Sequence, residues 1–304
     1  MDNLNICIPG GGVRGIVSSI FLERLEKQGL DLNKVKLFSG VSTGSIISAA
    51  LCMPNPYKPE EITELYRDLC GYIFDLPWYQ PKWLLKGAYG ASYDVKKLHE
   101  CLESHFKGSR LGDVLRPFCV TFYSLDERRG HKRRAQTLFV SNLTPPTEEY
   151  LDVKLADLVT ASCAAPTYFY PHRFKVGGRW VKAVDGGLVD NTGVLAALAT
   201  TYELGGCEKL NEMSLLILGN GAKQWHGNAA TEPERAWQIP RLAQTLINSI
   251  VQSGETMAIH TGRSFLGTRL QNINFSYENP IEIDDVNAIP ELEQFAYSTN
   301  LLPN

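Results

Sequence analysis

Short apolar runs alternate with helical stretches along this chain, and the alternation restricts its fold more than any other feature. Leu4–Pro9 and Val35–Ser39 predict buried strands, each followed by a turn and a predicted helix, over Gly15–Gln28 and Ser45–Met53. Strands separated by helices predict an α/β fold, with a mostly parallel central sheet flanked by helices. Ligands of such sheets bind beyond the carboxyl ends of the strands.

The same pattern continues and predicts one domain over residues 1–304. Further strands are expected at Pro117–Leu125, Ala135–Ser141, Trp180–Val184 and Met213–Leu218, and further helices at Lys58–Phe74, Leu151–Cys163, Val189–Leu204 and Ile239–Ile259. The motifs lie between residues 4 and 221, and residues 222–304 are expected to pack on the same domain.

Composition excludes several classes of protein. With 44% hydrophobic and 21% charged residues, the chain is typical of globular proteins. A formal net charge of −3 argues against a nucleic-acid polymer as partner. The seven cysteines contain no C-x-x-C pair, which predicts reduced thiols in the cytoplasm rather than zinc ligands. The N-terminus shows no targeting signal and no apolar run reaches the ~20 residues of a membrane span, so we expect any membrane contact from the water side.

Three successive glycines open the first predicted turn, which reads Gly10-Gly11-Gly12-Val13-Arg14-Gly15. This matches G-x-G-x-x-G, a pattern of dinucleotide-binding sites. Such a site also requires an acidic residue at the end of the next strand, and the sequence there, VKLFSG, has none. At a helix N-terminus, the glycines allow backbone N–H groups to point into open space, which favours an anion.

The second turn supplies a nucleophile. Gly40-Val41-Ser42-Thr43-Gly44 is G-x-S-x-G between a predicted strand and helix, the context of a nucleophile elbow. Attack by Ser42 on an ester generates an oxyanion, which the amides of Gly11, Gly12 and Val13 are expected to stabilise.

Two kinds of general base are compatible with this serine. In the order Ser–Asp–His of the α/β-hydrolases, the histidine would be His226 or His260, neither of which has supporting context. Alternatively, Asp185 follows a predicted strand directly, and Gly186 and Gly187 leave room for a ligand beside it. A free aspartate has a pKa of ~3.9 and is a weak base, so a Ser–Asp dyad works best where burial raises that pKa.

Five segments in sequence resemble the patatin-like phospholipase family: GGGVRG, GVSTG, ASCAAPTYFYP at Ala161–Pro171, DGGLVDN at Asp185–Asn191 and LILGNG at Leu216–Gly221. The resemblance implies a three-layer α/β/α lipid acyl hydrolase without metal or cofactor. It makes Ser42 the nucleophile, Asp185 the base and the loop Gly10–Gly15 the oxyanion hole. Pro9 and Gly193 depart from the family's usual residues, and residues 222–304 carry no recognisable motif.

The sequence gives weaker indications of partners and regulation. The aromatic segment Tyr72–Tyr93 is compatible with a lid or lipid-facing surface, but also with ordinary packing or a subunit contact in a homo-oligomer. The basic run Arg128–Arg134 is compatible with a solvated hairpin tip, with acidic lipid headgroups or with a phosphate-bearing regulator.

Because some bacterial proteins of the family that this chain resembles act in anti-phage defence, the resemblance implies a cyclic dinucleotide as a candidate activator. The expected location is the cytoplasm, peripheral at the inner membrane during activity. The rival interpretation is a non-catalytic nucleotide-binding or interaction module.

Overall fold

The computed structural model describes residues 3–74, 91–129, 132–223, 239–277 and 281–301. An eight-stranded sheet runs through the middle, in the pairing order β5-β6-β3-β2-β1-β7-β9, with β4 paired to β3. The strands are β1 Leu4–Ile8, β2 Leu37–Val41, β3 Phe118–Arg129, β4 Lys132–Ser141, β5 His172–Val176, β6 Arg179–Asp185, β7 Ser214–Leu218 and β9 Leu270–Ile273. A separate two-stranded sheet pairs β8 Ala222–Lys223 with β10 Ser276–Tyr277.

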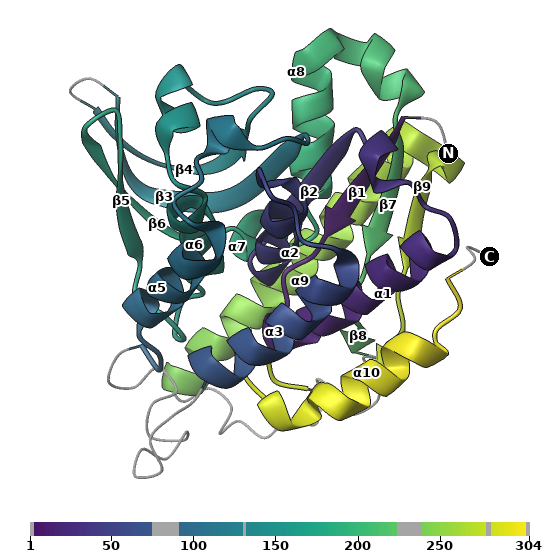
Figure 1. The fold of residues 1–304 in the computed structure, drawn as a ribbon. Coiled ribbons are helices and arrows are strands. Elements are labelled where there is room, and N and C mark those ends of the chain that lie inside the picture. Colours follow the sequence, from purple (N-terminus) through teal and green to yellow (C-terminus); the bar gives the residue numbers. More distant parts are fainter. Residues whose placement is uncertain (1–2, 75–90, 130–131, 224–238, 278–280, 302–304) are drawn as a thin grey trace.

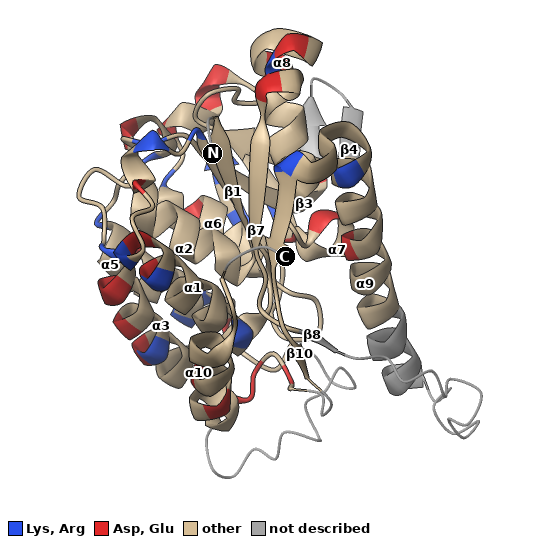
Figure 2. Cartoon of the chain, turned by 90° about the vertical axis from the view of Figure 1, so that its right-hand side faces the viewer, with Lys and Arg blue, Asp and Glu red and all other residues tan. Residues whose placement is uncertain are grey.

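Helices cover both faces of the sheet, so the chain has three layers (Figures 1 and 2). One layer holds α1 Gly15–Lys27, α2 Thr43–Cys52, α3 Pro59–Ile73, α5 Val95–Phe106, α6 Leu155–Cys163 and α10 Ile289–Ser298; the other holds α8 Val194–Glu212 and α9 Ile239–Leu266. Residues of β7 alternate between two hydrophobic cores: Leu216 and Leu218 face the first layer, Leu215 and Ile217 the second. This alternation is the reason the strand reads as a continuous apolar run.

Strand directions divide the sheet in two. Strands β3, β2, β1, β7 and β9 are parallel, whereas β4 and β6 are antiparallel to β3, and β5 to β6. The predicted α/β fold with a mostly parallel sheet and flanking helices is confirmed. The sequence patterns did not indicate α5, α10, β5 or β9.

One predicted helix is interrupted. Val189–Leu204 was expected to be continuous, but the structure has a short helix α7, Gly187–Asp190, before α8 begins at Val194. Gly193 between them has a φ of 74°, a left-handed conformation that ends a helix. Buried Asp190 accepts hydrogen bonds from the N–H groups of Gly193 at 3.1 Å and Ala196 at 3.0 Å, so its carboxylate caps the start of α8. The helix prediction failed here because it did not consider a side-chain cap.

The long strand β3 positions the ends of two other strands. One edge of β3 pairs with β4 throughout, and the opposite edge pairs first with β2 and then with β6. Val41 at the end of β2 lies opposite Thr121, and Asp185 at the end of β6 lies opposite the next residue, Phe122. Since β2 and β6 run in opposite directions along the same edge, their carboxyl ends meet.

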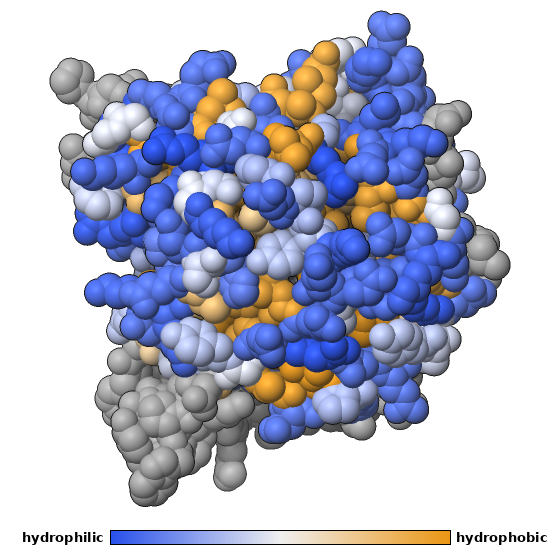
Figure 3. Space-filling view, in the orientation of Figure 1, coloured by the Kyte–Doolittle hydropathy of each residue, from blue (hydrophilic) through white to orange (hydrophobic). Residues whose placement is uncertain are grey.

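The surface is polar over most of the face seen in Figure 3, where apolar side chains form smaller patches between hydrophilic ones. Charged residues of both signs are interspersed on the helices (Figure 2). In the described part of the chain, no helix has the length and the apolar content needed to cross a membrane.

Candidate active site

Ser42 occupies a strained turn between β2 and α2. Its φ of 50° and ψ of −129° lie outside the regions that non-glycine residues favour. The flanking glycines make the turn possible, because a Cβ atom on Gly40 would meet the Gly44 carbonyl oxygen and one on Gly44 would meet that of Ile8. The Ser42 N–H donates to Ser162 Oγ at 2.8 Å, and this hydroxyl donates to the Thr121 carbonyl at 2.6 Å. The G-x-S-x-G segment therefore adopts the geometry of a nucleophile elbow.

Asp185 meets Ser42 where the two strands end. Its side chain is buried, and burial raises its pKa to about 6. Hydrogen bonds from the Ser42 hydroxyl and from the Gly187 N–H, the latter 2.7 Å from Asp185 Oδ1, oppose this rise but do not cancel it. The structure therefore brings together the two side chains that lie 143 positions apart in sequence, and it places the carboxylate where it can accept the serine proton.

Side chains bind three carbonyl groups of the glycine loop. The Gly10 oxygen accepts from the side-chain amides of Asn191 at 3.2 Å and Asn220 at 2.8 Å. The Gly11 oxygen accepts from Arg14 Nε at 3.2 Å, and the Gly12 oxygen from the Tyr66 hydroxyl. These four side chains fix the loop through its carbonyl acceptors.

Not every amide of the loop is available to a ligand. The Gly10 N–H donates to the Asn191 carbonyl at 3.0 Å, and the Val13 N–H to the Ile283 carbonyl at 2.8 Å. The expectation that Val13 contributes to an oxyanion hole is therefore wrong.

The later amides of the loop are also engaged, since those of Arg14 and Gly15 donate within the helical turn. The Gly11 N–H has only a long contact, 3.2 Å, with the Thr43 hydroxyl, and the Gly12 N–H has no hydrogen-bond partner among the described residues. Gly11 and Gly12 remain as candidate donors.

An acidic side chain that the sequence patterns did not single out supports this loop. Glu255 on α9 accepts from Asn191 Nδ2 at 2.5 Å, and Asn191 binds both the N–H and the carbonyl of Gly10. Burial raises the pKa of Glu255, whereas the bond from Asn191 and the charge of Arg14 oppose the rise. Asn191 and Asn220 belong to the DGGLVDN and LILGNG motifs, which could have pointed to them; Glu255 lies in the region without a recognisable motif.

A cavity of about 400 Å³ opens above these groups. Its wall includes Ser42, Asp185 and the glycine loop. Most of the lining area is apolar, from side chains of several elements: Ile46, Leu69, Ile73, Phe74, Leu98, Phe169, Leu188, Val251 and Ile281. A largely apolar pocket with a few convergent polar groups is the usual form of a small-molecule site.

Comparison with known proteins identifies the fold's relatives. Residues 6–198 match the model of the family described as patatin-like phospholipase. The chain belongs to this family. It is 29% identical to Patatin-like protein 2 of Arabidopsis thaliana over 66% of this chain and 53% of that protein, and 30% identical to Patatin-like protein 1 of the same plant over 64% and 50%. Patatin-07 of Solanum tuberosum is 28% identical over 56% of this chain and 44% of its own length. The chain thus spans about half the length of the relatives it matches.

One departure from the usual patatin-like motif has a clear structural consequence. Gly193 stands at a φ of 74°, which proline cannot adopt, and a Cβ atom there would lie 2.9 Å from Ser39 Oγ. The turn between α7 and α8 in this family member therefore depends on glycine. The turn is also anchored to β2, the strand that leads to Ser42, because the Gly193 carbonyl accepts a hydrogen bond from Ser39 Oγ at 2.8 Å.

The histidines that the structure describes do not support a Ser–Asp–His triad in this patatin-like chain. His260 is exposed on α9 and does not line the cavity, so the triad with His260 is wrong. His226 lies outside the described residues. Among the described residues, no histidine lines the cavity.

The two weaker sequence segments lie largely outside the described part of the chain, namely residues 75–90 and the side chains of 127–134. At the ends of the aromatic segment, Phe74 and Tyr93 pack edge to face with ring centroids 5.1 Å apart, and Phe74 lines the cavity. Tyr72 is exposed and lies under Lys97 Nζ, 4.2 Å from its ring centroid. The described ends thus contribute to packing and to the cavity wall.

Proposed function

We propose that this chain hydrolyses fatty-acyl esters of membrane phospholipids through a Ser42–Asp185 dyad. The observation that carries the proposal is that the buried carboxylate of Asp185 and the strained Ser42 meet where β6 and β2 end, in the wall of a mostly apolar cavity. Membership of the patatin-like phospholipase family supports the same class of reaction.

Acylation begins with attack of Ser42 Oγ on the ester carbonyl carbon, as its proton passes to Asp185. The carbonyl oxygen becomes an oxyanion, to which the N–H groups of Gly11 and Gly12 donate. When the tetrahedral intermediate collapses, the bond to the leaving alcohol breaks and Asp185 returns the proton to that alcohol. The product is a Ser42 acyl ester and a free lysolipid.

Deacylation repeats these steps with water as the nucleophile. Asp185 takes a proton from the water as its oxygen attacks the acyl carbon, and the same amides stabilise the second oxyanion. Collapse releases the fatty acid, and the proton returns to Ser42 Oγ. A base whose pKa lies near 6 suits this cycle, because it is ionised at neutral pH and still able to hold a proton during each intermediate.

The apolar cavity indicates the substrate class. Side chains such as Ile46, Leu69 and Phe169 offer an acyl chain contacts but no hydrogen bonds. Burial of apolar surface contributes roughly 25 cal/mol per Å², so a long chain binds more tightly than a short one.

A fluorogenic ester assay tests the enzyme assignment. Ser42→Ala and Asp185→Asn should each lose turnover by at least about 10³-fold while they keep the circular dichroism spectrum of the wild type. His260→Ala is the matched control and should retain full activity. Wild-type turnover in Ser42→Ala would leave the rival interpretation, a non-catalytic nucleotide-binding or interaction module.

Activation by a cyclic dinucleotide and a peripheral location at the inner membrane stay predictions from the sequence. A thermal-shift panel of cyclic dinucleotides tests the first: an activator should raise both the melting temperature and the turnover of the ester. A panel without either effect contradicts it.

A further inference from the structure

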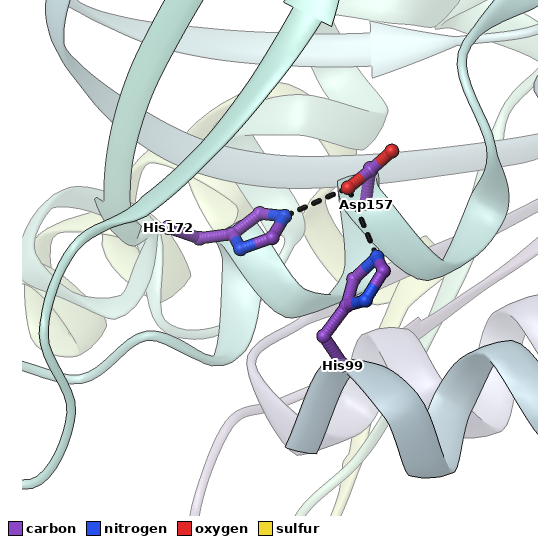
Figure 4. Close-up of side chains that lie close together, drawn as sticks. All are labelled: His99, Asp157 and His172. Carbon is purple, nitrogen blue, oxygen red and sulfur yellow. Dashed lines mark hydrogen bonds and ion pairs between the residues drawn. The ribbon is translucent and has the colours of Figure 1, made fainter. Parts of the chain in front are cut away.

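Three side chains from separate elements meet outside the active site (Figure 4). His99 comes from α5, Asp157 from α6 and His172 from the start of β5. His172 Nε2 lies 2.8 Å from Asp157 Oδ1, and His99 Nε2 lies 3.0 Å from the same oxygen. One nitrogen or oxygen atom from each residue lies within 4.8 Å of the others. The imidazole rings stack with centroids 5.1 Å apart, so both histidines approach the carboxylate from neighbouring directions.

Hydrogen bonding accounts for the position of only one of the two histidines. His172 is well placed to bond Asp157, but the buried Nε2 of His99 is not aligned for a hydrogen bond with any of the described residues. An anionic oxygen and two imidazole nitrogens therefore converge on one point.

We propose that His99, Asp157 and His172 bind a divalent transition-metal ion, with Zn²⁺ as the ion that fits this donor set. Zinc accepts imidazole nitrogen and carboxylate oxygen at about 2.0–2.2 Å, which places tetrahedral ligands about 3.3 Å apart. The observed separations of 2.8 and 3.0 Å require only a small opening. Each Nε2 must give its lone pair to the ion, so any proton on it passes to solvent. Mg²⁺ and Ca²⁺ prefer oxygen ligands and suit the site poorly.

The surroundings allow an ion to enter. The side chains of His99, Asp157 and His172 are 26%, 23% and 10% exposed, so water can reach the cluster and supply the fourth ligand. Glu103, one turn beyond His99 on α5, pairs through Oε1 with Lys154 Nζ at 2.5 Å, and its buried Oε2 has no hydrogen-bond partner among the described residues.

A bound ion would link structural elements that support the active-site residues. Asp157 lies on α6, which presents Ser162 to the N–H of Ser42. His172 lies opposite Ala183 on β6, two residues before Asp185. None of the three ligands lines the cavity. The ion would therefore stabilise the fold around the dyad without contact with the substrate, and this role does not depend on the proposed reaction.

Isothermal titration of the chelator-treated, untagged chain with ZnCl₂ tests the proposal. We expect one equivalent to bind, and a melting temperature about 5 °C higher at a zinc concentration 100 times the Kd. Co²⁺ should give the visible absorption bands of a tetrahedral nitrogen–oxygen site. His172→Ala and Asp157→Asn should each weaken zinc binding by at least about 100-fold, whereas His260→Ala, which removes an exposed histidine, should bind as the wild type does.

Three results would contradict the zinc proposal. Saturable zinc binding that survives in both His172→Ala and Asp157→Asn overturns the proposal, as does a wild type that takes up no zinc or is stabilised equally by Mg²⁺. Should His172→Ala fail to fold, His99→Gln replaces it, because His99 is the more exposed histidine. Circular dichroism of each metal-free variant separates loss of a ligand from loss of the fold.

Discussion

At the residue scale, the protonation of Asp185 sets the pH dependence of the proposed reaction. Burial raises its pKa to about 6, and only the ionised carboxylate can accept the proton of Ser42. The kcat/KM of a soluble ester should therefore rise about tenfold per pH unit below pH 6 and level off above about pH 7. A pH–rate profile with a parallel check of folding measures this. A flat profile below pH 6 contradicts the role of Asp185.

Glu255 acts at the same scale as a positioning residue. It holds Asn191, which holds Gly10, so its loss should shift the amides of Gly11 and Gly12 by a fraction of an ångström. Small misplacements of this kind are costly: we expect Glu255→Ala to lower kcat by about 10–100-fold and to change KM by less than about threefold.

Glu255→Gln keeps an oxygen that can accept from Asn191 and should restore most of the activity. Thr256→Ala, at the next and exposed position of α9, serves as the control. Equal losses in kcat for the alanine and glutamine variants would show that the charge of Glu255, not its bond to Asn191, matters.

At the scale of elements, α3 forms a wall of the cavity and limits the acyl chain. Ile73 lines the cavity, whereas its neighbour Tyr72 is exposed. Ile73→Trp should fill part of the space, so that the KM of a long-chain ester rises at least about tenfold while that of an acetyl or butyryl ester stays within about twofold. Tyr72→Trp should change neither. Steady-state kinetics over a series of chain lengths measures this; a uniform effect on all lengths places the acyl chain elsewhere.

The elements also show what sequence can predict. The turns around Gly10–Gly15 and Gly40–Gly44 were located because a glycine pattern between a strand and a helix has few other uses. The hydrogen-bonding roles of loop amides were not predictable, since the partner of Val13 is a backbone carbonyl at Ile283, far away in sequence. Glu255 and the cluster of His99, Asp157 and His172 escaped detection for the same reason: single residues at irregular spacing acquire meaning only when the fold brings them together.

At the scale of the whole molecule, the meeting of Ser42 and Asp185 follows from topology. In a purely parallel sheet, all carboxyl ends lie at one edge. Here β2 is parallel and β6 antiparallel to β3, so the carboxyl ends of β2 and β6 point toward each other. The length of β3 is decisive, because a shorter strand could pair with β2 or with β6 but not with both. No local pattern in the sequence of β3 indicates this double role.

The overall charge determines how the chain would approach a membrane. With a net charge of −3 and both signs interspersed on the helices, the molecule as a whole is not attracted to an anionic surface, so attraction must come from a local group such as the basic run Arg128–Arg134. Each basic residue near an anionic membrane contributes about 1 kcal/mol.

Reversal of two of these charges, in Arg133→Glu with Arg134→Glu, should therefore weaken binding to vesicles that contain phosphatidylglycerol by at least about 30-fold. Added salt should weaken the wild type in the same direction. Turnover of a soluble ester should not change, and Lys209→Glu on α8 is the matched control. Vesicle sedimentation measures the binding. If the affinity withstands both salt and charge reversal, an apolar contact brings the active site to its lipid.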